Sequence, residues 1–192
     1  VTVSNVAVPT ITSATYNVST GVLVVTGTGF TSKAGLTNDI DVTKLTLSGD
    51  STAYTLTANT TDVEITSATS FTVTLGATDK TAVASRLNKD GASSTGNVTY
   101  NLAAADDWNT AITGGDISDT TGNAVVVSNV PVPTITSATY DITTGILTVT
   151  GTGFLKLSGA ANDIDVTKLS LSGEGGASRT LTTSNVEITS GT

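Results

Sequence analysis

Hydrophobic and polar residues alternate along much of the chain, in short runs separated by turn residues. Residues 10–16 and 22–26 are two such runs, and the segment Asn17-Val18-Ser19-Thr20-Gly21 between them is rich in turn formers. Successive side chains of a strand point to opposite faces, so this alternation predicts strands with one buried face. We therefore predict a β-hairpin over residues 10–26.

The same period of two continues downstream, and each run is again bounded by turn-forming residues. Gly27-Thr28-Gly29 is expected to end the second strand and to direct the ring of Phe30 into the core. Many short strands with frequent turns are typical of a β-sandwich, so the sequence predicts an all-β fold. The further predicted strands are residues 44–48, 54–57, 63–65, 71–75 and 124–127.

Two segments depart from this alternation. Residues 79–87 place apolar side chains at helical spacing, with Thr78 or Asp79 as the expected N-cap. Residues 101–108 are rich in alanine and are predicted to form a second short helix. A short helical insertion is therefore expected in each copy of the fold.

The pattern repeats after 124 residues. Residues 1–48 and 125–172 are identical at 34 of 48 positions. A unit of this length can bury its own core, unlike the shorter units of solenoid proteins. We expect a piece of a longer array, in which residues 1–3 are the tail of a preceding repeat, 4–127 a complete repeat and 128–192 the first half of another. The prolines at the junction, Pro131 and Pro133, favour an extended and semi-rigid connection.

Composition narrows the possible functions. The chain has no Cys, His or Met and a formal net charge of −8. Nucleic acid is an unsuitable partner for such an acidic chain, and no apolar run is long enough to span a membrane as a helix. The nucleophile systems that pair Ser or Cys with His cannot be built within it, so no catalytic residues are expected. The acidic balance is compatible with calcium binding.

Two motifs carry a resemblance to known families. The stretch from Pro9 to Phe30, with its turn glycine and its Gly-x-Gly-Phe ending, resembles the opening of IPT/TIG-type immunoglobulin-like domains. The closing Asp119-Thr120-Thr121-Gly122-Asn123-Ala124 is similar to the end of immunoglobulin-like repeats in giant bacterial surface proteins and adhesins. The resemblance implies tandem immunoglobulin-like β-sandwich domains in a secreted, extracellular protein. Residues 78–108 depart from the family pattern and leave the strand order after residue 75 open.

Two sets of acidic and amide side chains are candidate calcium ligands, since Ca²⁺ prefers hard oxygen atoms. The alternative for the first set is that Asp41 caps a turn through residues 42–44, while Asp39 is solvated. For the second set, a turn is equally compatible with the sequence. The first set is Asn38, Asp39 and Asp41, which recurs as Asn162, Asp163 and Asp165; the second set, expected near the junction with the next repeat, is Asp116, Asp119 and Asn123.

Trp108 is the single tryptophan, and Asp106 and Asp107 precede it. An aromatic ring beside two carboxylates can bind carbohydrate. The alternative, which we favour, is that the tryptophan anchors a local element to the core.

Two functions remain open from the sequence. The first is a non-catalytic structural repeat that forms an adhesin stalk or a self-assembling surface filament. Its partners would be neighbouring repeats and other copies of the same protein, and calcium could stabilise it. The second is a multivalent array of carbohydrate-binding or surface-binding modules.

Overall fold

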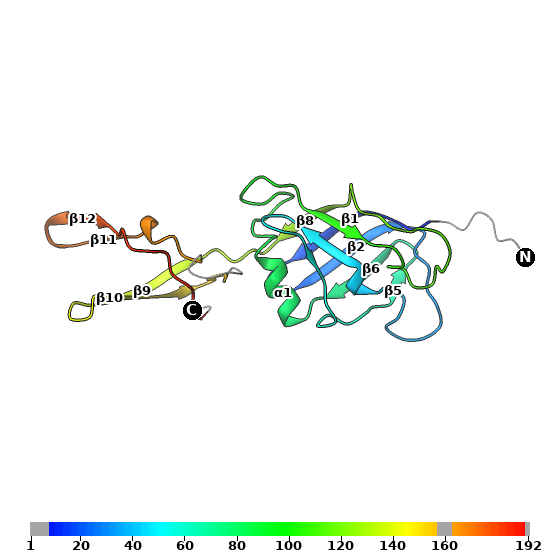
Figure 1. Cartoon of the computed structure of the whole chain (residues 1–192), viewed down its shortest axis with the longest axis horizontal. Helices are drawn as coiled ribbons and strands as arrows, with labels where there is room; N and C mark the ends of the chain where they lie inside the picture. The colour runs from blue at the N-terminus through cyan, green and yellow to red at the C-terminus, as the bar shows by residue number, and fades with distance from the viewer. Residues whose placement is uncertain (1–7, 157–162, 191–192) are drawn as a thin grey trace, which may run out of the picture. The chain divides into compact units, whose positions relative to one another are not determined.

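The computed structural model describes residues 8–156 and 163–190 (Figure 1). The chain divides into two compact units, Val1–Val130 and Pro131–Thr192. Strands dominate both, so the fold is all-β, as the alternation predicts. Within the described residues, no helix has the length and apolar character needed to cross a membrane.

In its described part, the first unit contains a single eight-stranded sheet. Its strand order is β4-β3-β7-β8-β1-β2-β6-β5. One short helix, α1 (Ala77–Ala84), follows β6. The strands are β1 (Thr10–Asn17), β2 (Val22–Thr28), β3 (Leu45–Ser48), β4 (Tyr54–Thr55), β5 (Ile65–Ser67), β6 (Ser70–Thr74), β7 (Asn101–Ala104) and β8 (Ala124–Ser128).

The predicted hairpin is confirmed as the antiparallel pair of β1 and β2. Its turn is held by Asn17, whose Oδ1 accepts hydrogen bonds from the backbone N–H groups of Ser19 (3.1 Å) and Thr20 (3.2 Å). Gly21 has a φ of 76°, in the left-handed region that glycine adopts without strain. The turn chemistry thus sets the register of the hairpin.

The sheet curls around one core. β7 and β8 are joined by the single pair Asn101–Ala124, so the sheet bends between them. The inward side chains of β3 and β7 share one hydrophobic cluster with those of β1, β2, β6 and β8. The ring of Phe30 lies 5.3 Å from that of Phe71 and 5.4 Å from that of Trp108, which confirms its expected place in the core.

The first and last strands of the unit are neighbours. β8 pairs with β1 in parallel, from Ser13 opposite Ala124 to Asn17 opposite Ser128. Both strands therefore run from the same end of the sheet to the other. The chain enters the unit at the start of β1 and leaves it at the opposite end, after Ser128.

The predicted helix at 79–87 exists, but its expected cap is wrong. The helix starts at Ala77 with Gly76 as N-cap, and Asp79 lies inside the first turn. The side chain that caps it comes from another loop, because Asn59 Oδ1 accepts a hydrogen bond from the N–H of Thr78 (3.0 Å). A Cβ on Gly76 would lie 2.0 Å from the carbonyl oxygen of Asn59, so this close approach requires glycine.

The second predicted helix, at 101–108, is wrong. Its first four residues form β7, in which Leu102 and Ala104 are buried and their neighbours are partly exposed. Pairing with β3 over four residue pairs outweighs the helix preference of the alanines. Asp107 has a φ of 64°, which ends any helical continuation before Trp108.

The second unit repeats the start of the first. Its strands are β9 (Thr134–Asp141), β10 (Ile146–Thr152), β11 (Ser170–Ser172) and β12 (Ser178–Thr180). β9 pairs only with β10, and β11 only with β12, among the residues described. Asp141 Oδ1 accepts hydrogen bonds from the N–H groups of Thr143 and Thr144, so Asn17 and Asp141 form the same turn, as the sequence predicts.

Candidate functional site

The candidate calcium ligands at 38–41 lie among loops, where hydrogen bonds hold four segments of the first unit together. Asp39 is fully buried rather than solvated. Its carboxylate accepts hydrogen bonds from the backbone N–H groups of Lys33 (2.7 Å) and Ile65 (2.9 Å). Its carbonyl oxygen accepts hydrogen bonds from the N–H of Thr110 and from Asn109 Nδ2. Asp39 therefore joins segments that lie far apart in the sequence.

Asn38 and Asp41 extend this cluster without sharing a partner with the Asp39 carboxylate. The N–H of Asn38 donates to Glu64 Oε1 (2.8 Å), and its buried Oδ1 accepts no hydrogen bond from any described residue. Asp41 caps the 3₁₀ turn Val42–Lys44, where its Oδ1 accepts from the N–H of Thr43 (3.0 Å). This is the turn that the sequence offers as the alternative to a metal ligand.

The second unit builds much of the same arrangement. Asp163 Oδ2 accepts a hydrogen bond from the N–H of Ile188 (2.7 Å), as Asp39 does from Ile65. Asp165 caps the 3₁₀ turn Val166–Lys168 through the N–H of Thr167. Asn162 lies outside the described residues. The recurrence shows that these hydrogen bonds are encoded within the repeated half.

Asp119 and Asn123 form a second hydrogen-bonded node, in which Asn123 is buried and Asp119 is partly buried. Asp119 Oδ2 accepts a hydrogen bond from the N–H of Ile11 (2.7 Å), and its Oδ1 accepts from Asn123 Nδ2 (2.9 Å). Asn123 Nδ2 also donates to the carbonyl oxygen of Leu102. The pair therefore ties the first strand to the last turn of the unit.

The position of this node corrects one expectation. Asp119 and Asn123 were expected near the junction with the next repeat, which follows Ser128. They lie instead at the start of β8, beside the start of β1, about 16 Å of strand away from that junction. Asp116 is exposed, and Ser118 lowers the pKa of its carboxyl group, first through the side-chain hydroxyl and then through the N–H, which donates to Asp116 Oδ1 (2.8 Å).

Trp108 lies inside the core. Its ring is fully buried, and its Nε1 donates to the carbonyl oxygen of Ile117 (2.8 Å). Asp106 and Asp107 are exposed, and Asp106 Oδ1 accepts from the N–H groups of Asp107 and Ile117. A stacking platform for a sugar requires an exposed ring face, and this arrangement instead matches the anchoring alternative.

Two hydrogen-bonded clusters, centred on Asp79 and Asp50, are not predicted from the sequence. Asp79 is fully buried, and its carboxylate accepts hydrogen bonds from Tyr54 Oη, from the N–H and Oγ1 of Thr57, and from Thr60 Oγ1. Burial by itself raises the pKa of Asp79, but the bonds from Thr60, Thr57 and Tyr54 outweigh it and lower this pKa. The carboxylate thus stays ionised and holds the loop before β5 to α1.

Asp50 is the centre of the other cluster. It accepts hydrogen bonds from Asn88 Nδ2, Ser94 Oγ and Thr95 Oγ1. Burial opposes its ionisation, but bonds from Thr95, Asn88, Ser94 and the N–H of Gly96 lower its pKa overall. The only signal in the sequence is the abundance of Ser, Thr and Asn, which does not reveal the partners.

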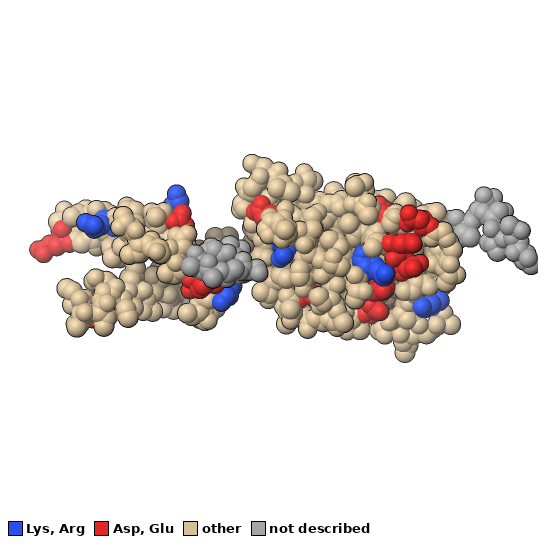
Figure 2. Space-filling model, viewed as in Figure 1, with Lys and Arg blue, Asp and Glu red and all other residues tan. Residues whose placement is uncertain are grey.

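Acidic side chains gather toward one end of the first unit on the face shown in Figure 2. Among the described residues, no group of three or more Asp, Glu, His or Cys side chains is arranged to hold a metal ion. Asp39, Asp41 and Asp119 each bind a different set of backbone N–H groups.

Comparison with family models, with curated proteins and with solved structures found no match for this chain.

Proposed function

We propose that the chain is a non-catalytic structural repeat of a long extracellular bacterial surface protein. In this proposal, tandem copies of the unit form an adhesin stalk or a surface filament. The repeat would supply length and a regular surface. Its partners would be neighbouring repeats of the same chain and other copies of the protein.

One observation carries this proposal: the parallel pairing of β1 with β8 in a sequence that repeats after 124 residues. Because the two strands run side by side in the same direction, the chain enters the unit at one end and leaves it at the other. Copies linked in this way extend in series without the chain turning back. An antiparallel pair would return the chain to the end at which it entered.

The length of β1 sets a lower bound on the length that each copy adds to the array. β1 has eight residues, and a strand rises by about 3.3 Å per residue, so each copy would add at least about 25 Å. The junction after Ser128 has no glycine, and Val130 donates its N–H to Asp90 Oδ1 (2.9 Å). This bond fixes the first residues of the junction to the unit that they leave.

The polar side chains also support a structural role. Asp39, Asp79 and Asp119 are bonded to backbone or hydroxyl groups of segments far away in the sequence. Carboxylates used in this way replace the disulfides that a chain without cysteine cannot form. Calcium is not needed for these bonds, and it forms no part of the proposal.

The proposal includes the type of fold. The curled sheet divides at the Asn101–Ala124 pair into β4-β3-β7 and β8-β1-β2-β6-β5, whose inner faces share one core. Two facing sheets of this kind are compatible with an immunoglobulin-like sandwich. The resemblance of residues 9–30 and 119–124 to repeats of surface adhesins supports the extracellular location.

The test is to measure length against copy number. Chains with one, two and four copies of the 124-residue repeat would be compared by small-angle X-ray scattering and by electron microscopy. We expect the longest dimension to rise linearly, by at least about 25 Å for each copy. A matched set with Pro131 and Pro133 replaced by glycine should be more flexible but equal in contour length. A size that grows only as for a compact globule would contradict the proposal.

A further inference from the structure

The loop of residues 88–96, here called the exit loop, holds the last residues of the first unit at two points. The N–H of Gly91 donates to the carbonyl oxygen of Val127 (2.9 Å), and the N–H of Val127 donates to that of Gly91 (2.8 Å). Asp90 Oδ1 accepts a hydrogen bond from the N–H of Val130 (2.9 Å), whose side chain packs against the core. The chain is therefore fixed to the first unit as far as Val130.

The exit loop is itself positioned by Asp50, which lies between β3 and β4. The Asp50 carboxylate accepts hydrogen bonds from Asn88 Nδ2 (2.5 Å), Ser94 Oγ (2.7 Å) and Thr95 Oγ1 (2.7 Å). Asn88 Oδ1 also accepts from the N–H of Thr95 (3.2 Å), which joins the two ends of the loop. The position of residues 89–93 between these ends therefore depends on Asp50.

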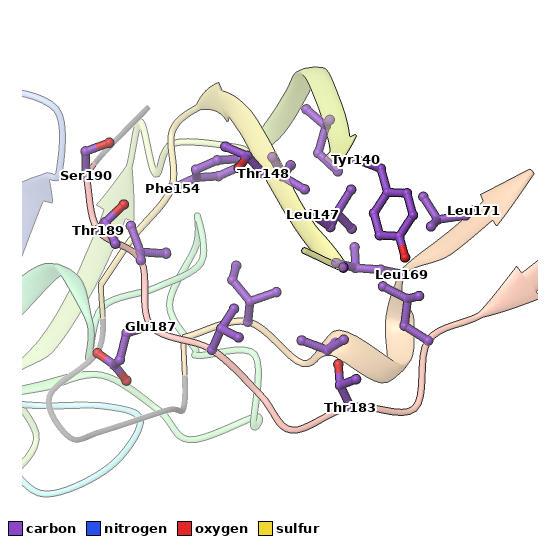
Figure 3. Close-up of a pocket in the computed structure, with 18 of the residues that line it drawn as sticks. Tyr140, Leu147, Thr148, Phe154, Leu169, Leu171, Thr183, Glu187, Thr189 and Ser190 are labelled. Atoms are coloured by element: carbon purple, nitrogen blue, oxygen red, sulfur yellow. The ribbon is translucent and has the colours of Figure 1, made fainter. Parts of the chain in front are cut away.

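The second unit holds the chain from the next residue onward. A Cβ on Gly153 would lie 2.9 Å from the carbonyl oxygen of Val132 and 3.3 Å from the Cβ of Pro131, so these residues pack closely. The neighbouring Phe154 has its ring against Gly151 of β10 and lines the apolar cavity of the second unit (Figure 3). Because Phe154 fixes this turn, Pro131 and Val132 are held by the second unit.

One connection remains that neither unit holds, the bond from Val130 to Pro131. The boundary between the two compact units falls at the same place. Proline fixes its own φ, and the residue before a proline is restricted to extended backbone. While the exit loop holds Val130, the connection between the units therefore has very few torsions about which it can turn.

The residue before Val130 is held in an uncommon conformation. Asn129 has a φ of 57°, in the left-handed region that few non-glycine residues adopt. On one side, the carbonyl oxygen of Ser128 accepts from the N–H of Val18 (3.0 Å), and on the other side Val130 is bonded to Asp90. Release of Val130 would allow Asn129 to leave this region, which favours opening once the bond to Asp90 is broken.

We propose that the exit loop controls where the joint between the two units begins. When the exit loop holds Val130, the joint is the bond from Val130 to Pro131. When the exit loop releases it, Ser128 is still held by Val18, and the joint gains Asn129 and Val130. Asp50 is a positioning residue, because it acts on the joint through the loop. This inference concerns the joint within this chain and does not depend on the proposed extracellular role.

Amide exchange of the full 192-residue chain, followed by NMR, tests the bond to Asp90. Asp90→Ala removes the acceptor, and the N–H of Val130 should then exchange about tenfold faster or more, since a paired amide exchanges only on opening. Asp90→Asn keeps a side-chain oxygen and should exchange as slowly as the wild type. Asp90 is exposed, so neither variant should unfold the unit, and exchange across β2 should not change.

Two spin labels measure the motion of the joint. Thr72→Cys and Thr139→Cys provide the attachment sites, at exposed strand positions of the first and second units. The chain has no cysteine of its own, so the labels attach only there. By pulsed electron paramagnetic resonance, Asp90→Ala should broaden the distribution of distances between the labels. Asp90→Asn should leave this distribution as in the wild type.

Asp50→Ala tests the positioning role. It should speed exchange at the three amides that fix the exit segment, those of Gly91, Val127 and Val130, and broaden the same distribution of distances. Asp79→Asn is the matched control, because it removes a buried carboxylate of the same unit that bonds to other segments. It should speed the amides that exchange by unfolding of the unit, but leave the exchange of Val130 and the distances unchanged.

Three results would overturn the proposal. The first is unchanged exchange of Val130 in Asp90→Ala. The second is faster exchange of Val130 with an unchanged distribution of distances, which would mean that this bond does not limit the joint. The third is an equal acceleration of all amides of the first unit in Asp50→Ala, as in Asp79→Asn, which would mean that Asp50 only stabilises the fold.

Discussion

The same sequence of strands occurs twice in this chain, and the two occurrences differ in what surrounds them. β1 and β2 lie in the middle of an eight-stranded sheet, whereas β9 and β10 pair only with each other among the described residues. Their turns and bulges are nevertheless the same. Gly21 and Gly145 have φ values of 76° and 73°, and the pairing shifts beside Ile11 in one hairpin and beside Gly151, the partner of Ile135, in the other.

Comparing the two hairpins separates features that neighbouring residues determine from features that depend on distant contacts. Gly27 and Gly151 each bring a carbonyl oxygen, of Thr10 or Thr134, to within about 2 Å of where a Cβ would be. That close approach recurs because both its partners belong to the repeated half. Burial of the apolar faces does not recur, because it depends on residues 69–128. The first half of the repeat thus encodes its backbone geometry, and the second half completes the core.

The largest expected effect is on the aromatic cluster. Phe30→Ala removes a ring that packs on Phe71 and Trp108, and should cost the first unit about 3–5 kcal/mol of unfolding free energy. Phe154→Ala is the matched variant in the second unit and should leave the unfolding of the first unit unchanged. Denaturant unfolding followed by the fluorescence of Trp108, the single tryptophan, measures this directly. Equal losses in the two variants would show that the units do not fold separately.

The next effect concerns Asp79, which has no counterpart among residues 131–192. Asp79→Asn should destabilise the first unit by about 2–4 kcal/mol at neutral pH, because the ionised carboxylate accepts four hydrogen bonds in the core. Its folded-state pKa is below the ordinary value of 3.8. Stability from this group is therefore present above that value and is lost as the pH falls through the folded pKa.

Unfolding free energies of the wild type and Asp79→Asn, measured from neutral to strongly acidic pH, should therefore converge below about pH 4. Asp62→Asn is a suitable control. Asp62 Oδ1 accepts from the N–H of Val42, and in the second unit Asn185 Oδ1 accepts the same bond from Val166. This control should change stability little at any pH. A constant difference between wild type and Asp79→Asn over the whole range would contradict the assignment.

The elements predicted correctly from the sequence depend on neighbouring residues. The hairpin of residues 10–26 follows from its alternation and from the Asn and Gly of its turn, and both copies have it. The strand at 71–75 and the burial of Phe30 follow from the same local pattern. The cap formed by Asp41 is also a short-range bond, which is why the sequence could offer it as an alternative.

The features that the sequence did not reveal depend on distant partners. Residues 101–104 have the composition of a helix and become a strand because they pair with distant segments, β3 on one side and β8 on the other. Asp39 is acidic in a polar stretch, and its burial requires backbone donors from residues 33 and 65. The partners of Asp79 lie 19 to 25 residues away. No periodicity within a single segment contains this information.

The smallest expected effect tests whether the two turns are equivalent. Asn17→Asp and Asp141→Asn exchange the residues of the two copies, and each should change stability by less than about 0.5 kcal/mol. The reason is that one side-chain oxygen accepts both backbone bonds in each turn, at 3.1 and 3.2 Å from Asn17 and at 2.8 and 3.2 Å from Asp141.

Alanine at either position is the control. It removes this acceptor and should lower the unfolding free energy more than the substitution of Asn by Asp, or of Asp by Asn, does. Denaturant unfolding measures the stability of Asn17→Asp and Asn17→Ala. Amide exchange at residues 143–145 measures the stability of the turn in Asp141→Asn and Asp141→Ala. If Asn17→Asp or Asp141→Asn lost as much stability as the alanine variant, each turn would depend on its surroundings in the unit. The conclusion that neighbouring residues determine the turn would then be wrong.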